Sequence, residues 1–149
     1  MKPCQDCGKD PYPKYCFFKD DMEQIYSILE KCDLIVLGSP VYFDTVSAQV
    51  KLMIDRSNCL MPYTKCPDGS YGFMRRLKKE RIGVLIAVAG IEQEFGAMIA
   101  TVKGFFNWAN IKLAETILYP HSDENYGGVQ DNESMMKKAF QVGAQLVSR

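Results

Sequence analysis

The sequence predicts an α/β fold in which a parallel sheet lies between two layers of helices, with residues 1–149 forming a single domain. Three short, mainly apolar segments, at 34–38, 82–89 and 115–119, are typical of strands that are buried inside a parallel sheet. Apolar residues at helical spacing precede the first segment, lie between the segments and follow the last one. This alternation indicates about three parallel strands and four main helices.

The first predicted strand begins at Leu34 and is followed by a turn and a helix. We expect the strand to end at Gly38-Ser39-Pro40, because proline cannot donate a hydrogen bond to a neighbouring strand. Apolar residues then recur at i, i+4, i+7 and i+8 from Val46 to Ile54, which is one face of a helix. Ligands of open parallel sheets bind outside the carboxyl ends of the strands, so the loop 40–45 is expected to lie on the ligand side.

A helix is also predicted before this strand, over residues 20–33. Asp20 with Glu23 three residues later has the pattern of a capping box. Behind this start, Met22, Tyr26 and Leu29 fall on one apolar stripe. The stripe predicts a helix that packs on the sheet.

The remaining elements follow the second strand, 82–89. A loop leads into a long helix at about 93–110, and the third strand ends at Pro120, beside His121, the single histidine. Asp131 or Asn132 is expected to cap a terminal helix. The apolar residues expected to face inward from that helix are Met135, Met136, Phe140, Gly143, Leu146 and Val147.

The ordered strings around the first loop resemble a known family. Gly-Ser-Pro-Val-Tyr-Phe at 38–43, followed by Val-Ser-Ala-Gln-x-Lys at 46–51 and Ile-Asp-Arg at 54–56, is similar to the flavodoxin-like NAD(P)H-dependent FMN reductases. The nearest branch is that of the iron–sulfur flavoproteins. The resemblance implies a flavodoxin-like fold, FMN as cofactor and NAD(P)H as electron donor, with a small molecule or a protein as electron acceptor.

The resemblance also implies which residues contact the flavin. One edge of the ring is expected to lie against Ser39, Pro40, Val41, Tyr42 and Phe43. The other edge is expected to lie against Ala89, Gly90, Ile91 and Glu92. No acid–base residue is demanded, since hydride passes directly between nicotinamide and flavin, and the catalytic residues remain unassigned.

Residues 1–19 form a loop rich in proline, glycine and cysteine. Iron–sulfur flavoproteins have a compact four-cysteine motif at the matching place, to which Cys4, Cys7 and Cys16 correspond, while Asp10 stands where the third cysteine would be. A [4Fe–4S] cluster normally takes four thiolates. The sequence therefore leaves three alternatives open: a cluster completed by Asp10 or Cys66, a loop with free thiols, or a zinc site.

The resemblance begins partway through the family pattern, after the family's first strand and phosphate loop. Three explanations follow: the chain starts further upstream, it is a shortened relative with an exposed strand edge, or it binds flavin without that anchor. An exposed edge favours pairing with another subunit. A long connecting loop at 57–80 also suits a subunit contact, so we expect a homodimer or homotetramer.

The composition argues against several other classes of function. The formal net charge is zero, which argues against binding of nucleic acid, and no apolar stretch is long enough to span a membrane. Six cysteines without an export signal indicate a reducing, cytoplasmic environment. Two alternatives to the flavoenzyme remain: a flavin-free flavodoxin-like module that acts as a subunit or interaction domain, and a cysteine-based metal-binding protein.

Overall fold

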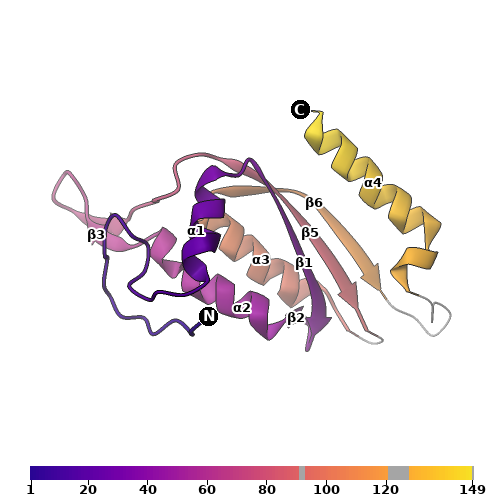
Figure 1. The fold of residues 1–149 in the computed structure, drawn as a ribbon, viewed down its shortest axis with the longest axis horizontal. Coiled ribbons are helices and arrows are strands. Elements are labelled where there is room, and N and C mark those ends of the chain that lie inside the picture. Colours follow the sequence, from indigo (N-terminus) through magenta and orange to yellow (C-terminus); the bar gives the residue numbers. More distant parts are fainter. Residues whose placement is uncertain (91–92, 121–127, 149) are drawn as a thin grey trace.

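The computed structural model describes residues 1–90, 93–120 and 128–148. Its longer elements alternate between strands and helices in chain order, as the sequence predicts (Figure 1). The elements are α1 (Met22–Lys31), β1 (Leu34–Tyr42), β2 (Thr45–Val46), α2 (Ala48–Arg56), the 3-10 helix η1 (Ser57–Leu60), β3 (Tyr63–Lys65), β4 (Tyr71–Phe73), β5 (Arg81–Ala89), α3 (Gly96–Trp108), β6 (Ile111–Pro120), the 3-10 helix η3 (Val129–Asp131) and α4 (Glu133–Val147).

The main sheet has the strand order β2-β1-β5-β6. The three predicted strands are confirmed as its parallel part, because β5 pairs in parallel with β1 on one side and with β6 on the other. The short strand β2 adds to β1 in the antiparallel direction and was not predicted. Neighbouring parallel strands end at the same edge, so the loops after β1 and β5 lie next to each other.

Strand β1 continues past Pro40 to Tyr42, so the expected end at Gly38-Ser39-Pro40 was wrong. Tyr42 pairs with Thr45 across a two-residue turn, which directs the Tyr42 N–H toward β2. N–H groups alternate in direction along a strand, so the Pro40 nitrogen also points to that side, beyond the last residue of β2. The missing N–H of proline therefore removes no hydrogen bond to β5.

The main core lies on one face of the sheet, where buried residues of α1 and α3 form one cluster with residues of β1 and β5. Figure 1 shows how these elements are arranged. Met22, Tyr26 and Leu29 of α1 are buried there, which confirms the predicted stripe. The capping box was wrong, because the N-cap of α1 is Asp21, whose side chain makes no capping hydrogen bond, and the Asp20 carboxylate accepts the N–H of Met22 rather than that of Glu23. The Asp20 carboxylate also pairs with the Arg56 guanidinium, at 2.8 Å.

The last helix, α4, lies apart from the other helices, beside β6 (Figure 1). Asn132 caps it as predicted, since its side chain accepts the Met135 N–H. The inward face was predicted correctly only in part: Met135 and Leu146 are half-buried, but none of the residues of α4 is fully buried, and Met136, Phe140, Gly143 and Val147 are exposed. The half-buried residues are Met135, Ala139, Val142 and Leu146.

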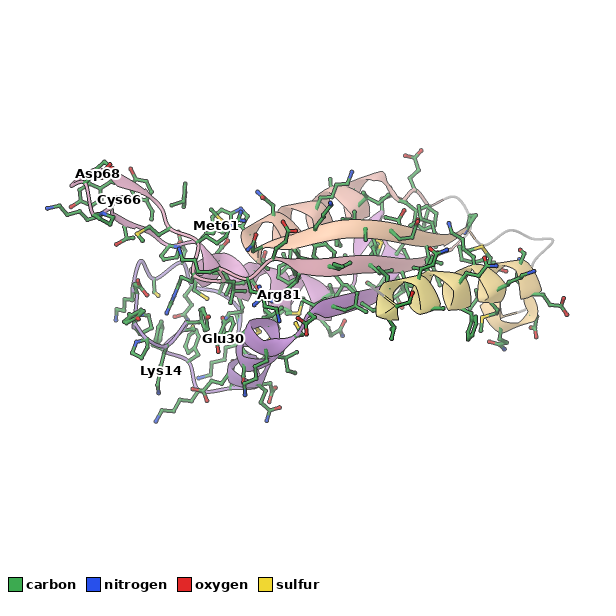
Figure 2. All side chains as sticks on the ribbon, turned by 90° about the horizontal axis from the view of Figure 1, so that it is seen from above. Lys14, Glu30, Met61, Cys66, Asp68 and Arg81 are labelled. Carbon is green, nitrogen blue, oxygen red and sulfur yellow. The ribbon has the colours of Figure 1, made fainter. Side chains whose placement is uncertain are left out.

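The connection at 57–80 is more regular than the sequence suggested. It contains η1 and a β3–β4 hairpin, which projects from the rest of the molecule with Cys66 and Asp68 near its tip (Figure 2). The hairpin exposes the aromatic rings of Tyr63, Tyr71 and Phe73. Across the described ranges, no helix has the length and apolar character needed to cross a membrane.

Candidate functional site

The two loops that the sequence assigns to the flavin are joined by a hydrogen bond. Phe43 and Asp44 form the two-residue turn between β1 and β2, and both have positive φ, 49° and 60°. The Asp44 carboxylate accepts the backbone N–H of Glu94, which follows β5, at 2.8 Å. Sequence reasoning missed Asp44, because its partner is a backbone group 50 residues away.

Ser39 and Val41 support this edge from inside the molecule. Both side chains are buried, and Val41 belongs to the main core. The Ser39 hydroxyl accepts the Ser47 N–H at 3.0 Å and donates to the Pro40 carbonyl at 2.8 Å. Ser39 therefore fixes the start of α2 against the end of β1, and its hydroxyl is already engaged.

The residues available to contact a ligand here are Pro40, Tyr42, Phe43 and Gly90, all of which are exposed. The Tyr42 side chain is 57% exposed and that of Phe43 is 93% exposed. Ala89 is buried, and the Gly90 N–H is held by the Gln93 side chain at 2.9 Å. Ile91, Glu92 and His121 lie outside the described residues.

Such a surface fits the ring portion of a flavin. Apolar and aromatic side chains stack on flat aromatic ligands, and among the described residues Phe43 and Pro40 are exposed to solvent. A strongly exposed phenylalanine held at positive φ is unfavourable by itself. The turn geometry therefore keeps an apolar ring exposed at the edge where this fold binds ligands.

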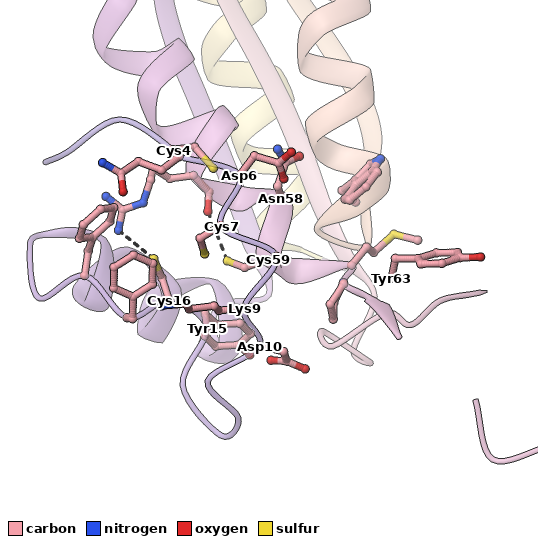
Figure 3. Close-up of a pocket in the computed structure, with 18 of the residues that line it drawn as sticks. Cys4, Asp6, Cys7, Lys9, Asp10, Tyr15, Cys16, Asn58, Cys59 and Tyr63 are labelled. Carbon is pink, nitrogen blue, oxygen red and sulfur yellow. Dashed lines mark hydrogen bonds between the residues drawn. The ribbon is translucent and has the colours of Figure 1, made fainter. Parts of the chain in front are cut away.

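A second candidate site lies at the other end of the molecule, away from the carboxyl ends of β1 and β5. A cavity of about 340 Å³ is lined by Arg56 and Trp108, the last residues of α2 and α3, and by the cysteine loop (Figure 3). Four cysteines line it: Cys4, Cys7, Cys16 and Cys59. Cys66, which the sequence offered as a replacement ligand, is in the hairpin and does not line this cavity.

Arg56 orders the cysteine loop around the cavity. One of its terminal nitrogens donates to the Lys2 carbonyl at 2.7 Å, and the other lies 3.5 Å from the Cys16 sulfur. Its hydrogen bonds to Asp20 hold the pKa of that carboxyl well below its usual range. Burial opposes the charge of Arg56, but the hydrogen bond to Asp20 raises the arginine pKa overall.

Arg56 also has an unused donor. Its side chain is 1% exposed, and its Nε–H is buried without a hydrogen-bond acceptor among the described residues. A buried N–H that lacks an acceptor is unfavourable by roughly 1–3 kcal/mol. Because Arg56 also lines the cavity, this donor is a candidate partner for an electron-rich ligand bound there.

Cys59 comes to the same cavity from η1. Its thiol lies 3.3 Å from both the Tyr26 hydroxyl and the Arg56 carbonyl. Burial raises the pKa of the Cys59 thiol to about 11, so it is protonated at neutral pH when it has no metal. Sequence reasoning missed Cys59, because its spacing of 43 residues from Cys16 matches no metal-binding motif.

Asp10 is directed to a different partner. Its carboxylate pairs with the Arg76 guanidinium at 3.2 Å, and Arg76 also donates to the carbonyls of Pro13 and Lys14. Among the described residues no three His, Cys, Asp or Glu side chains are gathered as ligands of a single metal ion. The metal-binding role of Cys4, Cys7 and Cys16 stays a prediction.

Comparison with known proteins identifies relatives over most of the chain. The sequence profile of the NADPH-dependent FMN reductases matches residues 2–119. An iron-sulfur flavoprotein of Methanocaldococcus jannaschii is 42% identical over 128 residues, which cover 86% of this chain and 59% of that protein. One from Methanosarcina thermophila is 27% identical over 151 residues, covering 99% of this chain and 68% of that protein. The chain thus spans about three fifths to two thirds of these relatives.

Solved structures support the fold assignment. An FMN-dependent NADH-azoreductase from Bacillus anthracis, solved in complex with FMN, superposes with a TM-score of 0.60 at 15% identity, covering 84% of this chain and 62% of that chain. An NADPH-quinone reductase from P. pentosaceus gives 0.56 at 13% identity, covering 80% of this chain and 71% of that chain. The predicted flavodoxin-like fold is confirmed at this level.

Proposed function

Because the chain belongs to the NADPH-dependent FMN reductase family, we propose that it is an FMN-binding oxidoreductase that uses NAD(P)H as electron donor. The observation that carries the proposal is the exposed surface of Pro40, Tyr42 and Phe43, beside Gly90, at the carboxyl ends of β1 and β5. FMN, when bound, supplies the exchange of hydride and electrons with donor and acceptor. A homodimer or homotetramer and a small-molecule or protein acceptor are part of the same proposal.

The chain's own residues bind and orient the ring. Phe43 and Pro40 provide an apolar surface for it, and the turn at 43–44 fixes the direction of that surface. Asp44 holds the end of the second loop against the first through the Glu94 N–H. A surface fixed in this way binds a rigid ring with a smaller loss of conformational entropy than two independent loops would.

Removal of the exposed ring tests the proposal. We expect the anaerobically purified protein to bind FMN at micromolar affinity or tighter, and Phe43→Ala to weaken that binding about tenfold, the effect of about 1.4 kcal/mol. Quenching of FMN fluorescence during titration measures both constants. Phe140→Ala removes another strongly exposed phenylalanine, from α4, and should leave the affinity unchanged.

The outcome also separates the alternative functions. A protein that is colourless and indifferent to FMN would be the flavin-free module, and the enzyme proposal for this chain would be wrong. Binding of FMN together with oxidation of NADH or NADPH supports the proposal.

Asp44 gives a second test of the same edge. Asp44→Ala removes the acceptor of the Glu94 N–H and should weaken FMN binding about fivefold by releasing the second loop. Asp44→Asn keeps an acceptor oxygen and tolerates positive φ, so it should bind FMN nearly as the unsubstituted protein does. Amide exchange at Glu94 should rise in the alanine variant alone. Equal exchange in all three proteins would contradict the linking role of Asp44.

A further inference from the structure

The cavity at the cysteine loop contains one thiol more than the family motif accounts for. Cys4, Cys7 and Cys16 occupy three positions of the compact motif, and Cys59 lines the cavity with them (Figure 3). Asp10, at the position of the third motif cysteine, also lines the cavity but is paired with Arg76. We propose that Cys59 replaces Asp10 as the fourth thiolate ligand, so that Cys4, Cys7, Cys16 and Cys59 hold a [4Fe–4S] cluster.

The arrangement of the thiols favours a cluster over a single ion. A tetrahedral zinc site needs all four sulfurs about 2.3 Å from one point, and no three such ligands are gathered in this way in the described chain. In a [4Fe–4S] cluster each thiolate binds a different iron, so the sulfurs stand around a core instead of around a point. Four thiols line one cavity of about 340 Å³, which offers a common space for such a core.

The hydrogen-bond donors around the cavity suit an anionic cluster. A [4Fe–4S] core with four thiolates carries net negative charge, and the lining contains the cations Arg56 and Lys9 together with the carboxylates of Asp6 and Asp10, of which Asp10 is paired with Arg76. Arg56 already donates toward the Cys16 sulfur at 3.5 Å. Its buried Nε–H lacks an acceptor among the described residues and could donate to a sulfur of the core.

Cluster formation balances without an added oxidant. Two ferrous ions, two ferric ions and four sulfides give the 2+ core, and each Fe–S(Cys) bond forms as its thiol releases a proton to solvent. The Cys59 proton leaves a hydrogen bond to the Arg56 carbonyl, and that carbonyl keeps the Tyr26 hydroxyl as a donor at 2.6 Å. No backbone acceptor is left unpaired by the change.

The test is anaerobic reconstitution of the full chain and its variants with ferrous and ferric iron and sulfide. We expect about four iron and four acid-labile sulfide per chain, with the broad absorbance of a cluster near 400 nm and an EPR signal on reduction. Cys59→Ser should lose most of the bound iron and sulfide, at least about fourfold, because three thiolates remain. Cys32→Ser is the matched control, since Cys32 is half-buried at the end of α1 and does not line the cavity.

A rescue variant distinguishes loss of a ligand from loss of the fold. Asp10→Cys combined with Cys59→Ser restores the four-cysteine motif and should recover the cluster. The thermal unfolding of Cys59→Ser, followed by Trp108 fluorescence, should stay close to that of the unsubstituted protein. A Cys59→Ser variant that retains full iron and sulfide would overturn the assignment, and so would one zinc per chain without sulfide.

The test of Cys59 as a cluster ligand can fail or succeed independently of the test of FMN binding. A chain that binds FMN but takes up no iron or sulfide overturns the role of Cys59 alone. A chain that holds the cluster but ignores FMN overturns the proposed function alone.

Discussion

Asp20→Asn is expected to lower the free energy of unfolding at pH 7 by about 3 kcal/mol. The substitution keeps the size of the side chain but leaves the Arg56 guanidinium, whose side chain is 1% exposed, without a counter-charge. Asp20 also accepts the backbone N–H groups of Lys2 and Met22, so the loop before α1 loses part of its anchoring. Urea unfolding followed by Trp108 fluorescence measures the change.

An exposed ion pair provides the matched control for this substitution. Lys51 and Asp55 lie 2.6 Å apart, but each side chain is 47% exposed. Asp55→Asn is therefore expected to change stability by about 0.5 kcal/mol or less. Equal effects of the two substitutions would contradict the assignment of Asp20–Arg56 as the ion pair that holds the loop.

The stabilisation that Asp20 gives to the folded state depends on pH, and the direction of its pKa shift predicts how. Its pKa is depressed in the folded state, so the stabilisation is complete above the unfolded-state pKa of about 3.9. As pH falls below this value, the unfolded chain takes up the proton first and the contribution is progressively lost. The gap in stability between Asp20→Asn and the unsubstituted protein should therefore narrow below about pH 4.

Gly83→Ala is expected to destabilise the protein by about 3 kcal/mol. A Cβ at this position in β5 would lie 2.3 Å from Cε2 of Phe106 and 2.6 Å from Cγ2 of Ile111. Both neighbours are buried in the main core, so neither can move aside without disturbing the packing of α3 on the sheet. Thermal or urea unfolding with Trp108 as the probe measures the loss.

A second glycine separates this steric effect from the intrinsic properties of glycine. Gly104 lies inside α3, where an added Cβ has no atom within 4 Å. Gly104→Ala should stabilise the protein by about 1 kcal/mol, because alanine favours helix over glycine. In a Phe106→Leu background the cost of Gly83→Ala should fall, and an unchanged cost would rule out the contact with the ring.

The sequence predicts those elements of the fold that are determined by residues close together along the chain. The apolar runs that begin at Leu34 and Ile82 became the parallel strands β1 and β5. Burial on both faces, which such runs predict, holds for most of β5, but it was wrong for β1, where Val36 on one face is exposed. The carboxyl-edge position of Tyr42 and Phe43 followed from the same strands. The ordered strings of the first loop then pointed to the family, as the sequence profile bears out.

The errors arose where a distant partner decides what a residue does. Asp20 resembles the first residue of a capping box in sequence, but its carboxylate accepts the N–H of Met22 instead of that of Glu23, and it forms charge-assisted hydrogen bonds with Arg56, 36 residues away. Phe140 looks inward-facing because α4 has two apolar stripes, and only the one facing β6 is partly covered. Cys59 enters the cysteine cavity through the path of η1, which no local pattern encodes.

The separate position of α4 has a consequence for cooperativity. None of its residues is fully buried, so its stability depends largely on intrinsic helix propensity and on the Asn132 cap. An isolated helix of this length is marginal in water. The helical signal in circular dichroism therefore includes the contribution of α4, which can unfold while the core remains intact. The unfolding transition measured by circular dichroism need not coincide with the one measured by Trp108 fluorescence. Trp108, at the end of α3, reports the unit that holds the cysteine cavity.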